Sequence, residues 1–272
     1  DSKLDYLFID EAGQVSLADL VAIGGVAKNI VLIGDQMQLG QPLKGTHPGE
    51  SGNSILDFLL EGKDTIPSHK GIFLNKTYRL NYKINEFVSN NFYEGKLVTD
   101  EITGKRKIFF QKNHIIKTDG IHHISMNHKD NIQKSIEEGE LIKKILNEMI
   151  GLTYFDGKKE RKLTLEDFLI ISPYNSQVNY LLSILKNAKV GTIDKFQGQE
   201  AAVTIISMTS SDSDILPRNK EFFFNRNRLN VAISRAQCAS IILFNPELLN
   251  FSPRTVEQIK LLNNFYKLLK YK

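Results

Sequence analysis

Leu4-Asp5-Tyr6-Leu7-Phe8-Ile9-Asp10-Glu11-Ala12-Gly13 is an apolar run that stops at two adjacent carboxylates. The apolar part predicts a buried strand, because short runs of large aliphatic and aromatic residues suit strands that are covered by neighbours. A carboxylate that follows such a strand can hold Mg²⁺ through water, and a second can activate a water molecule that attacks a phosphate. Acidic pairs also end strands to keep them soluble, so this stretch alone leaves both interpretations open.

The two carboxylates are typical of P-loop NTPases, in which a phosphate-binding loop should precede them. Such a loop reads G-x-x-x-x-G-K-[ST], and its backbone N–H groups cradle the phosphates. The Gly-Lys pairs of this chain are not followed by Ser or Thr: Gly62-Lys63, Gly95-Lys96, Gly104-Lys105 and Gly157-Lys158. We therefore expect the chain to be the C-terminal part of a larger NTPase, with little or no ATPase activity by itself.

The composition predicts one large or two medium domains, since 41% of the 272 residues are hydrophobic. No run approaches the roughly 20 apolar residues that a membrane span needs, and no basic-then-apolar start resembles a signal peptide. We therefore expect no membrane association. The single cysteine, Cys238, excludes an intrachain disulfide, fits a cytoplasmic protein and predicts a small buried core residue.

The net charge of +4 is unevenly distributed along the chain. Residues 1–72 hold ten acidic and five basic side chains, a net of −5, so residues 73–272 carry +9. A basic second part is compatible with a nucleic-acid partner, although a lysine-rich solvated surface would give the same charge. The arginines are more informative, because four of the eight crowd one segment: Arg218, Arg226, Arg228 and Arg235.

The pattern of apolar residues predicts an α/β fold of mostly parallel sheets with helices on both faces. Continuous apolar runs predict strands at 4–9, 30–33, 72–74, 168–171, 203–207 and 241–244. Helical spacing predicts helices at 81–93, 178–185 and 255–269. A break near 68–71 predicts two domains, 1–72 and 73–272. Residues 99–131 are interpreted as an insertion, in which 107–110 and 121–125 would form a hairpin.

A second buried strand ends in a polar loop at Val31-Leu32-Ile33-Gly34-Asp35-Gln36-Met37-Gln38-Leu39. In open α/β folds the carboxyl edge of the sheet is where ligands bind, which predicts that Asp35 and Gln38 lie at a site. An ordinary strand-to-loop turn would be the preferred interpretation if this segment stood alone.

Three further motifs follow in order along the chain: Thr77-Tyr78-Arg79-Leu80, Val190-Gly191-Thr192-Ile193-Asp194-Lys195-Phe196-Gln197-Gly198-Gln199-Glu200 and Asn225–Ala236. Within the last, Arg228 and Arg235 are two helical turns apart and would share a face. A guanidinium that reaches a γ-phosphate from a second domain can raise the rate by about 10³–10⁵. A surface salt-bridge network could explain each motif alone, but not all five in this order.

Together these motifs resemble superfamily 1 helicases, of the branch that includes the nonsense-mediated-decay RNA helicase and its DNA-acting relatives. The matching segments are Asp10-Glu11-Ala12-Gly13-Gln14, Gly34-Asp35-x-x-Gln38-Leu39, Tyr78-Arg79, Ser172-Pro173-Tyr174-Asn175, Asp194–Glu200 and Arg228–Arg235. The resemblance implies that 1–72 is the C-terminal part of a first RecA-like, ATP-binding domain, and that 73–272 is a second RecA-like domain. ATP would be hydrolysed between the two.

The resemblance also implies roles for individual residues. Asp10 would hold Mg²⁺, Glu11 would act as general base, and Gln38 would sense the γ-phosphate of ATP. Arg79 and Arg235 would reach that phosphate from the second domain, while Gly198 and Glu200 would contact the γ-phosphate and ribose. Further nucleotide-binding residues would be Gln14, Asp35 and Arg228. Ser172, Tyr174 and Thr192 would touch a nucleic-acid strand.

The implied activity is ATP-dependent translocation on single-stranded nucleic acid, DNA in preference to RNA, with 5′-to-3′ polarity. The stretch from Gly40 to Gly52 resembles a bacterial subgroup in which a RecB-like nuclease module accompanies the helicase. Two departures from the family are Leu80-Asn81-Tyr82 in place of Met-His-Pro and Asn227-Arg228 in place of paired arginines. The alternative is a non-catalytic nucleic-acid-binding or subunit-interaction remnant. The histidines at 114, 122, 123 and 128 lack the spacing of a metal site.

Overall fold

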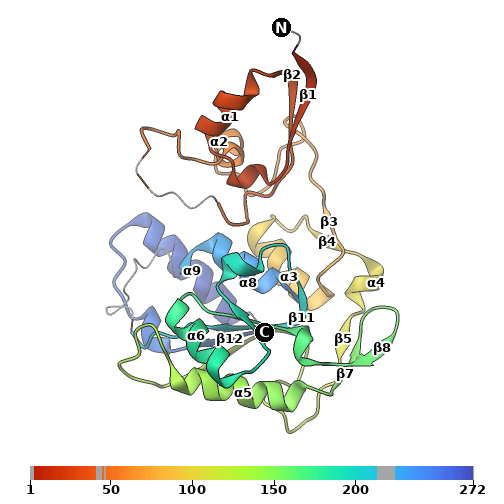
Figure 1. Cartoon of the computed structure of the whole chain (residues 1–272), viewed down its shortest axis with the longest axis vertical. Helices are drawn as coiled ribbons and strands as arrows, with labels where there is room; N and C mark the ends of the chain where they lie inside the picture. The colour runs from red at the N-terminus through yellow and green to blue at the C-terminus, as the bar shows by residue number, and fades with distance from the viewer. Residues whose placement is uncertain (1–2, 41–44, 46, 213–223, 272) are drawn as a thin grey trace. The chain divides into compact units, whose positions relative to one another are not determined.

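The computed structural model describes residues 3–40, 45, 47–212 and 224–271. The chain divides into two compact units by its internal contacts (Figure 1). The first unit comprises Asp1–Leu74 with Phe92–Glu94, and the second comprises Asn75–Asn91 with Gly95–Lys272. We describe each unit by itself.

The first unit is built on two short parallel strands (Figure 1). Its described elements are β1 (Leu4–Ile9), the 3₁₀ turn η1 (Ala12–Gln14), α1 (Leu17–Gly24), β2 (Ala27–Leu32) and α2 (Ile55–Leu60). β1 pairs with β2 from Leu4↔Ala27 to Ile9↔Leu32. A small apolar core lies on one side of the strands: Ile9, Ala12, Ile55, Leu56 and Leu60. The other side of β1 leaves Leu4, Tyr6 and Phe8 at least 59% exposed, so the prediction that this strand is buried is wrong.

Both helices of the first unit begin at a serine that caps them. Ser16 accepts a hydrogen bond from the Asp19 N–H at 3.1 Å, and Ser54 accepts one from the Asp57 N–H at 3.0 Å. Each cap satisfies an N–H group that the first helical turn leaves without a partner, and an acid in that turn complements the helix dipole. The repeated Ser-x-x-Asp spacing therefore fixes where α1 and α2 start.

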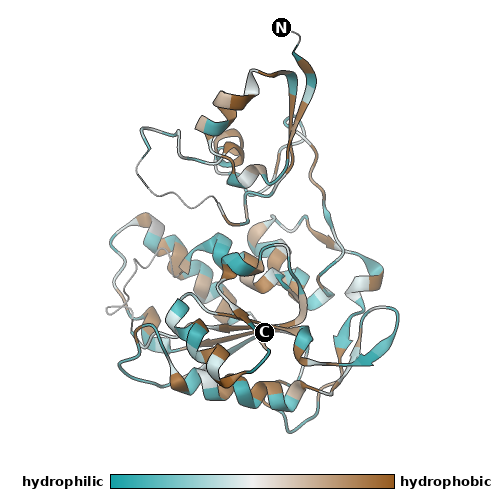
Figure 2. Ribbon diagram, viewed as in Figure 1, coloured by the Kyte–Doolittle hydropathy of each residue, from teal (hydrophilic) through white to brown (hydrophobic). Residues whose placement is uncertain are grey.

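The second unit is organised around a five-stranded sheet in which every pairing is parallel. The strands stand in the order β10 (Lys189–Gly191), β9 (Phe168–Ile171), β11 (Ala201–Ser207), β12 (Ala236–Phe244) and β6 (Gly120–Ser125). The three central strands are almost fully buried, and Figure 2 colours them largely as hydrophobic. Parallel strands with two covered faces require such continuous apolar sequences.

Helices cover both faces of this sheet. On one face α5 (Ile136–Met149) and α6 (Asn175–Ile184) pack with Ile170, Ile205 and Ile241 in one hydrophobic cluster. On the other face α8 (Arg226–Ser234) contacts β11 and β12, and α9 (Val256–Lys270) places Phe265 at 5.7 Å from the Phe244 ring. The α/β class with parallel sheets, predicted from the sequence, is confirmed.

The remaining described elements of this unit lie outside the central sheet. They are β3 (Lys76–Thr77), α3 (Tyr82–Phe92), β4 (Val98–Thr99), α4 (Glu101–Gly104), β5 (Lys107–Ile108), β7 (Thr153–Phe155), β8 (Glu160–Lys162), η2 (Leu165–Asp167), η3 (Ile193–Phe196) and η4 (Pro246–Leu249). β3 pairs with β4, and β5, β7 and β8 form a small antiparallel sheet. The last residue of α3 belongs to the first unit.

Two of the expected elements are wrong. The predicted hairpin of 107–110 with 121–125 does not form, because β6 joins the central sheet beside β12 while β5 pairs with β7. Residues 120–125 of the 99–131 segment therefore belong to the central sheet and not to an insertion. The strand expected at 72–74 is also absent from this described segment, where Ile72 and Leu74 are 86% and 79% exposed and carry no strand pairing. The next strand after this segment is β3, which begins at Lys76.

Two other expectations concern membranes and the cysteine. Among the described residues, no helix combines the length and the apolar character that crossing a bilayer would require. Cys238 lies within β12 and is fully buried, as predicted, and burial raises the pKa of its thiol far above the ordinary value. An uncharged buried thiol of this kind acts as a small apolar residue.

The central sheet makes a stability prediction. Replacing the fully buried Ile241 by alanine should lower the free energy of unfolding by about 2–5 kcal/mol, because it removes apolar contacts and leaves a cavity. The matched control is Ile136→Ala at the start of α5, where the side chain is 56% exposed. This substitution should lower the free energy of unfolding by no more than about 0.5 kcal/mol. Urea unfolding followed by circular dichroism compares the two, and equal losses would contradict the assignment of the core.

Candidate functional site

The acidic pair of the first unit follows β1 directly. The Asp10 Oδ1 accepts a hydrogen bond from the Glu11 N–H at 2.9 Å, and both carboxylates are exposed. Glu11 has a φ of 51°, in the left-handed region that non-glycine residues rarely adopt. Such backbone strain costs on the order of 1–3 kcal/mol and is concentrated at functional sites. The side chain of Gln14 approaches the Glu11 carboxylate at 3.5 Å.

The loop after β2 is organised by the carboxylate of Asp35. One of its oxygens accepts the Met37 N–H at 2.9 Å, and the other accepts the Gln38 side-chain amide at 3.1 Å. The Tyr93 hydroxyl donates to the same oxygen at 2.6 Å. No sequence pattern indicated this role of Tyr93, because Tyr93 is 58 residues away from Asp35 and belongs to no motif. Asp35 therefore fixes the backbone that carries Gln38.

Two glycines allow the loops after β1 and β2 to pack against each other. A Cβ on Gly13 would lie 2.8 Å from the Asp35 carbonyl oxygen, and one on Gly34 would lie 2.7 Å from the Ala12 nitrogen. Between them the Ala12 N–H donates to the Ile33 carbonyl at 2.9 Å. The structure thus brings the Asp10–Gln14 and Asp35–Gln38 segments together at the carboxyl ends of neighbouring parallel strands, where α/β folds bind ligands.

This arrangement can accommodate Mg²⁺ but not a metal cage built from protein ligands alone. Among the residues described, no group of three or more His, Cys, Asp or Glu side chains is placed to hold a metal ion. Mg²⁺ commonly uses one or two carboxylates together with waters and substrate phosphates. The exposed Asp10 carboxylate fits that kind of coordination.

In the second unit the predicted residues Arg79 and Glu200 form an ion pair. The Arg79 Nε donates to the Glu200 carboxylate at 2.6 Å, and its Nη1 donates to the Ser234 carbonyl at 3.4 Å. The other oxygen of Glu200 accepts the Gln237 side-chain amide at 2.9 Å. Burial alone would raise the pKa of Glu200, but the Arg79 and Gln237 hydrogen bonds outweigh it and hold the pKa below its usual value.

The last residue of this cluster is Arg235, which directly follows α8. Its side chain is only 2% exposed, and its Nη1 donates to the Gln199 carbonyl at 3.3 Å. The neighbouring Gly198 has a φ of 77°, a conformation that favours glycine. Within the second unit, the structure therefore brings together Arg79, Arg235, Gly198 and Glu200.

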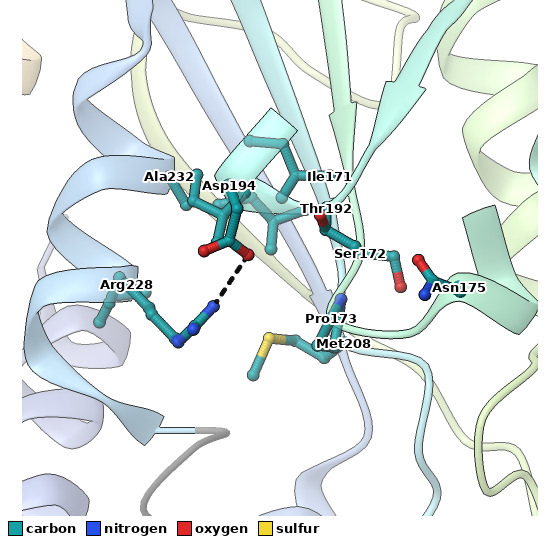
Figure 3. Close-up of a pocket in the computed structure, with 12 residues that line it drawn as sticks. Ile171, Ser172, Pro173, Asn175, Thr192, Asp194, Met208, Arg228 and Ala232 are labelled. Atoms are coloured by element: carbon teal, nitrogen blue, oxygen red, sulfur yellow. Dashed lines mark hydrogen bonds and ion pairs between the residues drawn. The ribbon is translucent and has the colours of Figure 1, made fainter. Parts of the chain in front are cut away.

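A pocket of about 230 Å³ lies at the carboxyl ends of β9, β10 and β11 (Figure 3). Its lining is largely apolar with a few polar groups: Ile171, Ser172, Pro173, Asn175, Thr192, Ile193, Asp194, Ile206, Met208, Arg228, Leu229 and Ala232. Figure 3 shows Arg228 and Asp194, which form an ion pair at 3.4 Å, across the pocket from Asn175. Ser172 and Thr192, which are predicted to bind nucleic acid, therefore line the same pocket as Arg228, which is predicted to bind the nucleotide.

Two predicted nucleic-acid residues are buried beside this pocket. Ser172 is fully buried and its hydroxyl lies 3.1 Å from the Thr209 hydroxyl. Tyr174 is 4% exposed and its hydroxyl lies 3.5 Å from the Ser210 hydroxyl. Both side chains therefore contact the turn after β11, and Met208 of that turn lines the pocket. Sequence reasoning missed Met208 and the turn, because no charged or glycine-rich pattern marks them.

Other sequence features lie apart from these sites or outside the described residues. His122 Nε2 is 2.7 Å from the Thr118 carbonyl, whereas His128 is buried beside Glu138. Arg218, residues 41–44 and residue 46 are not among the described residues, so the interpretation of the Gly40–Gly52 stretch stays a prediction.

Comparisons with known proteins find one matching family and several helicases among the similar proteins. A model of the family described as "AAA domain" matches residues 52–247. The chain is 28% identical over 291 residues to "DNA replication ATP-dependent helicase/nuclease dna2" of Schizosaccharomyces pombe, covering 96% of this chain and 20% of that protein. It is 26% identical over 277 residues to "ATP-dependent helicase NAM7" of Saccharomyces cerevisiae, covering 92% and 26%.

Among solved structures, an arterivirus helicase, nonstructural protein 10 in complex with DNA, aligns with a TM-score of 0.44 and 14% identity. That alignment covers 90% of this chain and 40% of the viral chain. The chain therefore spans about a fifth to a quarter of the two curated relatives described above.

The Arg79–Glu200 pair predicts a measurable shift. In Arg79→Ala the pKa of Glu200 should rise, because burial still raises this pKa while the Arg79 hydrogen bond that lowered it is lost. Because the Arg79 pair lowers the pKa of Glu200, the pair stabilises the folded protein fully at pH values above the ordinary pKa of glutamate. This stabilisation is lost as the pH falls through the lowered pKa of Glu200. Titration of the carboxyl carbons by NMR measures the shift.

Asp156 serves as the internal control for that titration. Its pKa is lowered mainly by the backbone N–H groups of Lys159 and Lys158, which the Arg79 substitution leaves in place. An unchanged Glu200 pKa in Arg79→Ala would contradict the ion pair, and a shift of Asp156 would reveal a wider structural change.

Proposed function

Because the chain belongs to the AAA domain family and, with its relatives, to the superfamily 1 helicases of the nonsense-mediated-decay and Dna2 branch, we propose that it is part of an ATP-dependent helicase or translocase. The observation that carries the proposal is the pairing of two acid-bearing loops on adjacent parallel strands. One loop carries Asp10 and Glu11 and the other carries Asp35 and Gln38, and the two meet where Gly13 lies against the Asp35 carbonyl. A binding module without catalysis has little use for the adjacent Asp10 and Glu11 carboxylates at this position.

The first unit would supply the acids for ATP hydrolysis. Asp10 would hold Mg²⁺, which when bound neutralises phosphate charge. Glu11 would accept a proton from the attacking water, and Gln38 would respond to the γ-phosphate while Asp35 fixes its loop. Gln14 lies next to Glu11 and would help to orient it.

The second unit would supply positive charge to the same nucleotide. Arg79 and Arg235 would stabilise the charge that develops on the γ-phosphate, as guanidinium groups do in related phosphoryl transfers. Gly198 would leave room for the nucleotide and Glu200 would accept hydrogen bonds from the ribose. Because Glu200 already holds Arg79, a bound nucleotide would compete for both side chains.

A strand of nucleic acid would bind at the pocket formed by the ends of β9, β10 and β11. Thr192 is partly exposed there and can donate to a phosphate, while Arg228 adds positive charge. Ser172 and Tyr174 would act on the strand through the turn they contact. We propose single-stranded DNA as the preferred substrate, 5′-to-3′ movement, a cytoplasmic setting and a RecB-like nuclease module in the same protein.

The proposal predicts ATP hydrolysis that single-stranded nucleic acid stimulates, measured on the full-length protein that contains these residues. Glu11→Gln should abolish the stimulated turnover with at least about a hundredfold loss, since general-base catalysis contributes about 10²–10⁴-fold. The matched control is Glu160→Gln, which changes an exposed carboxylate in β8 and should leave turnover unchanged.

The 272-residue chain alone should hydrolyse ATP weakly or not at all, because it lacks a Gly-Lys-[ST] phosphate loop. Full-length protein that binds single strands in a salt-dependent manner but shows no turnover would overturn the motor proposal. That outcome would instead support the binding remnant.

A further inference from the structure

The carboxylate of Glu138, in α5, is fully buried behind the nucleic-acid pocket. Both of its oxygens accept the Thr209 backbone N–H, each at 3.0 Å. One oxygen also lies 3.2 Å from His128 Nε2, and the other accepts the Ser207 hydroxyl. Burial raises the pKa of Glu138, and the hydrogen bonds to the charged form oppose that rise.

The groups around Glu138 can be assigned protons so that the carboxylate is ionised. The Asn131 N–H donates to the Ser211 hydroxyl at 3.0 Å, and the oxygen of this hydroxyl lies 2.7 Å from His128 Nδ1. In the tautomer with its proton on Nε2, His128 donates to Glu138 and accepts the Ser211 O–H at Nδ1. With this assignment Glu138 faces only donors, which is the environment that an ionised carboxylate requires.

The order Ser211–His128–Glu138 has the connectivity of a hydrolytic triad, but the arrangement cannot act as one. The three side chains are at most 4% exposed, so no substrate reaches the Ser211 oxygen. That oxygen already accepts the Asn131 N–H. The network must therefore work by holding its surroundings in place.

The group that the network holds is the turn of residues 207–211, which begins at the last residue of β11. Thr209 has a φ of 72°, which is unfavourable for a β-branched residue and needs support from its surroundings. Glu138 supplies this support by binding the Thr209 N–H. Met208, the preceding residue, lines the pocket, and the Thr209 hydroxyl is 3.1 Å from that of Ser172.

We propose that Glu138 is a positioning residue for nucleic-acid binding, which holds the 207–211 turn so that Met208 and Ser172 shape the pocket. The inference rests on the proposed function, because the pocket is taken to bind a single strand. Glu138 touches no ligand itself. It acts through Thr209, from a helix on the opposite face of the sheet from α8.

The test compares two buried carboxylates in the full-length protein. Glu138→Gln keeps the shape but replaces one acceptor by an NH₂ group that faces donors, which disrupts the turn. Asp167→Asn is the matched control, because Asp167 is also buried but lies at the start of β9, at the opposite end of the sheet, where it binds Arg161 and the Thr164 N–H.

The readout is ATP hydrolysis as a function of single-stranded DNA concentration. In Glu138→Gln the concentration for half-maximal stimulation should rise about tenfold, from the loss of a charge-assisted hydrogen bond, while turnover at saturation is kept. Ser207→Ala removes a single donor to Glu138 and should give a smaller rise of the same sign, even if the glutamine variant fails to fold. Asp167→Asn should lower the thermal midpoint without changing the half-saturating concentration.

Two outcomes would overturn the inference and are distinguishable. If wild-type protein binds and responds to single strands but Glu138→Gln and Ser207→Ala leave half-saturation unchanged, the inference fails and the proposed function stands. If Asp167→Asn raises half-saturation equally, the effect is general destabilisation and the inference fails. A wild-type protein that neither binds nor responds to a strand overturns the proposed function together with the inference.

Discussion

The parallel direction of neighbouring strands is the constraint on which both candidate sites depend. In a parallel pair all chain segments leave the sheet at the same edge, so residues that are distant in sequence collect there. β1 and β2 deliver Asp10 and Asp35 to one such edge, and β9, β10 and β11 deliver Ser172, Thr192 and Met208 to another. An antiparallel pairing would have sent successive loops to opposite ends.

The edge loops do not hold themselves in place. In each unit a buried or half-buried carboxylate gathers backbone N–H groups and side-chain donors around a turn: Asp35 in the first and Glu138 in the second. A carboxylate suits this task because it accepts from several directions and strengthens each hydrogen bond with its charge. The cost of burial is offset by the number of donors, so removing even one donor should loosen the turn.

Sequence patterns predicted the strands that local runs of residues encode, and they missed the contacts between residues that are distant in the sequence. Continuous apolar runs identified β9, β11 and β12, because strands covered on both faces need an unbroken apolar sequence. The partners of Asp35 and Glu138, which are Tyr93 and Thr209, lie 58 and 71 residues away, and no local spacing encodes them. The mistaken hairpin has the same cause, since 121–125 pairs with a strand more than a hundred residues later. The predicted roles of the site residues remain predictions.

The three residues 92–94 belong to the first unit, although the chain on both sides of them belongs to the second. The backbone therefore passes between the units three times. A single cleavage near residue 74 would leave Tyr93, the partner of Asp35, on the wrong fragment. An exchange of the first unit between relatives would therefore have to graft two separate segments, Asp1–Leu74 and Phe92–Glu94.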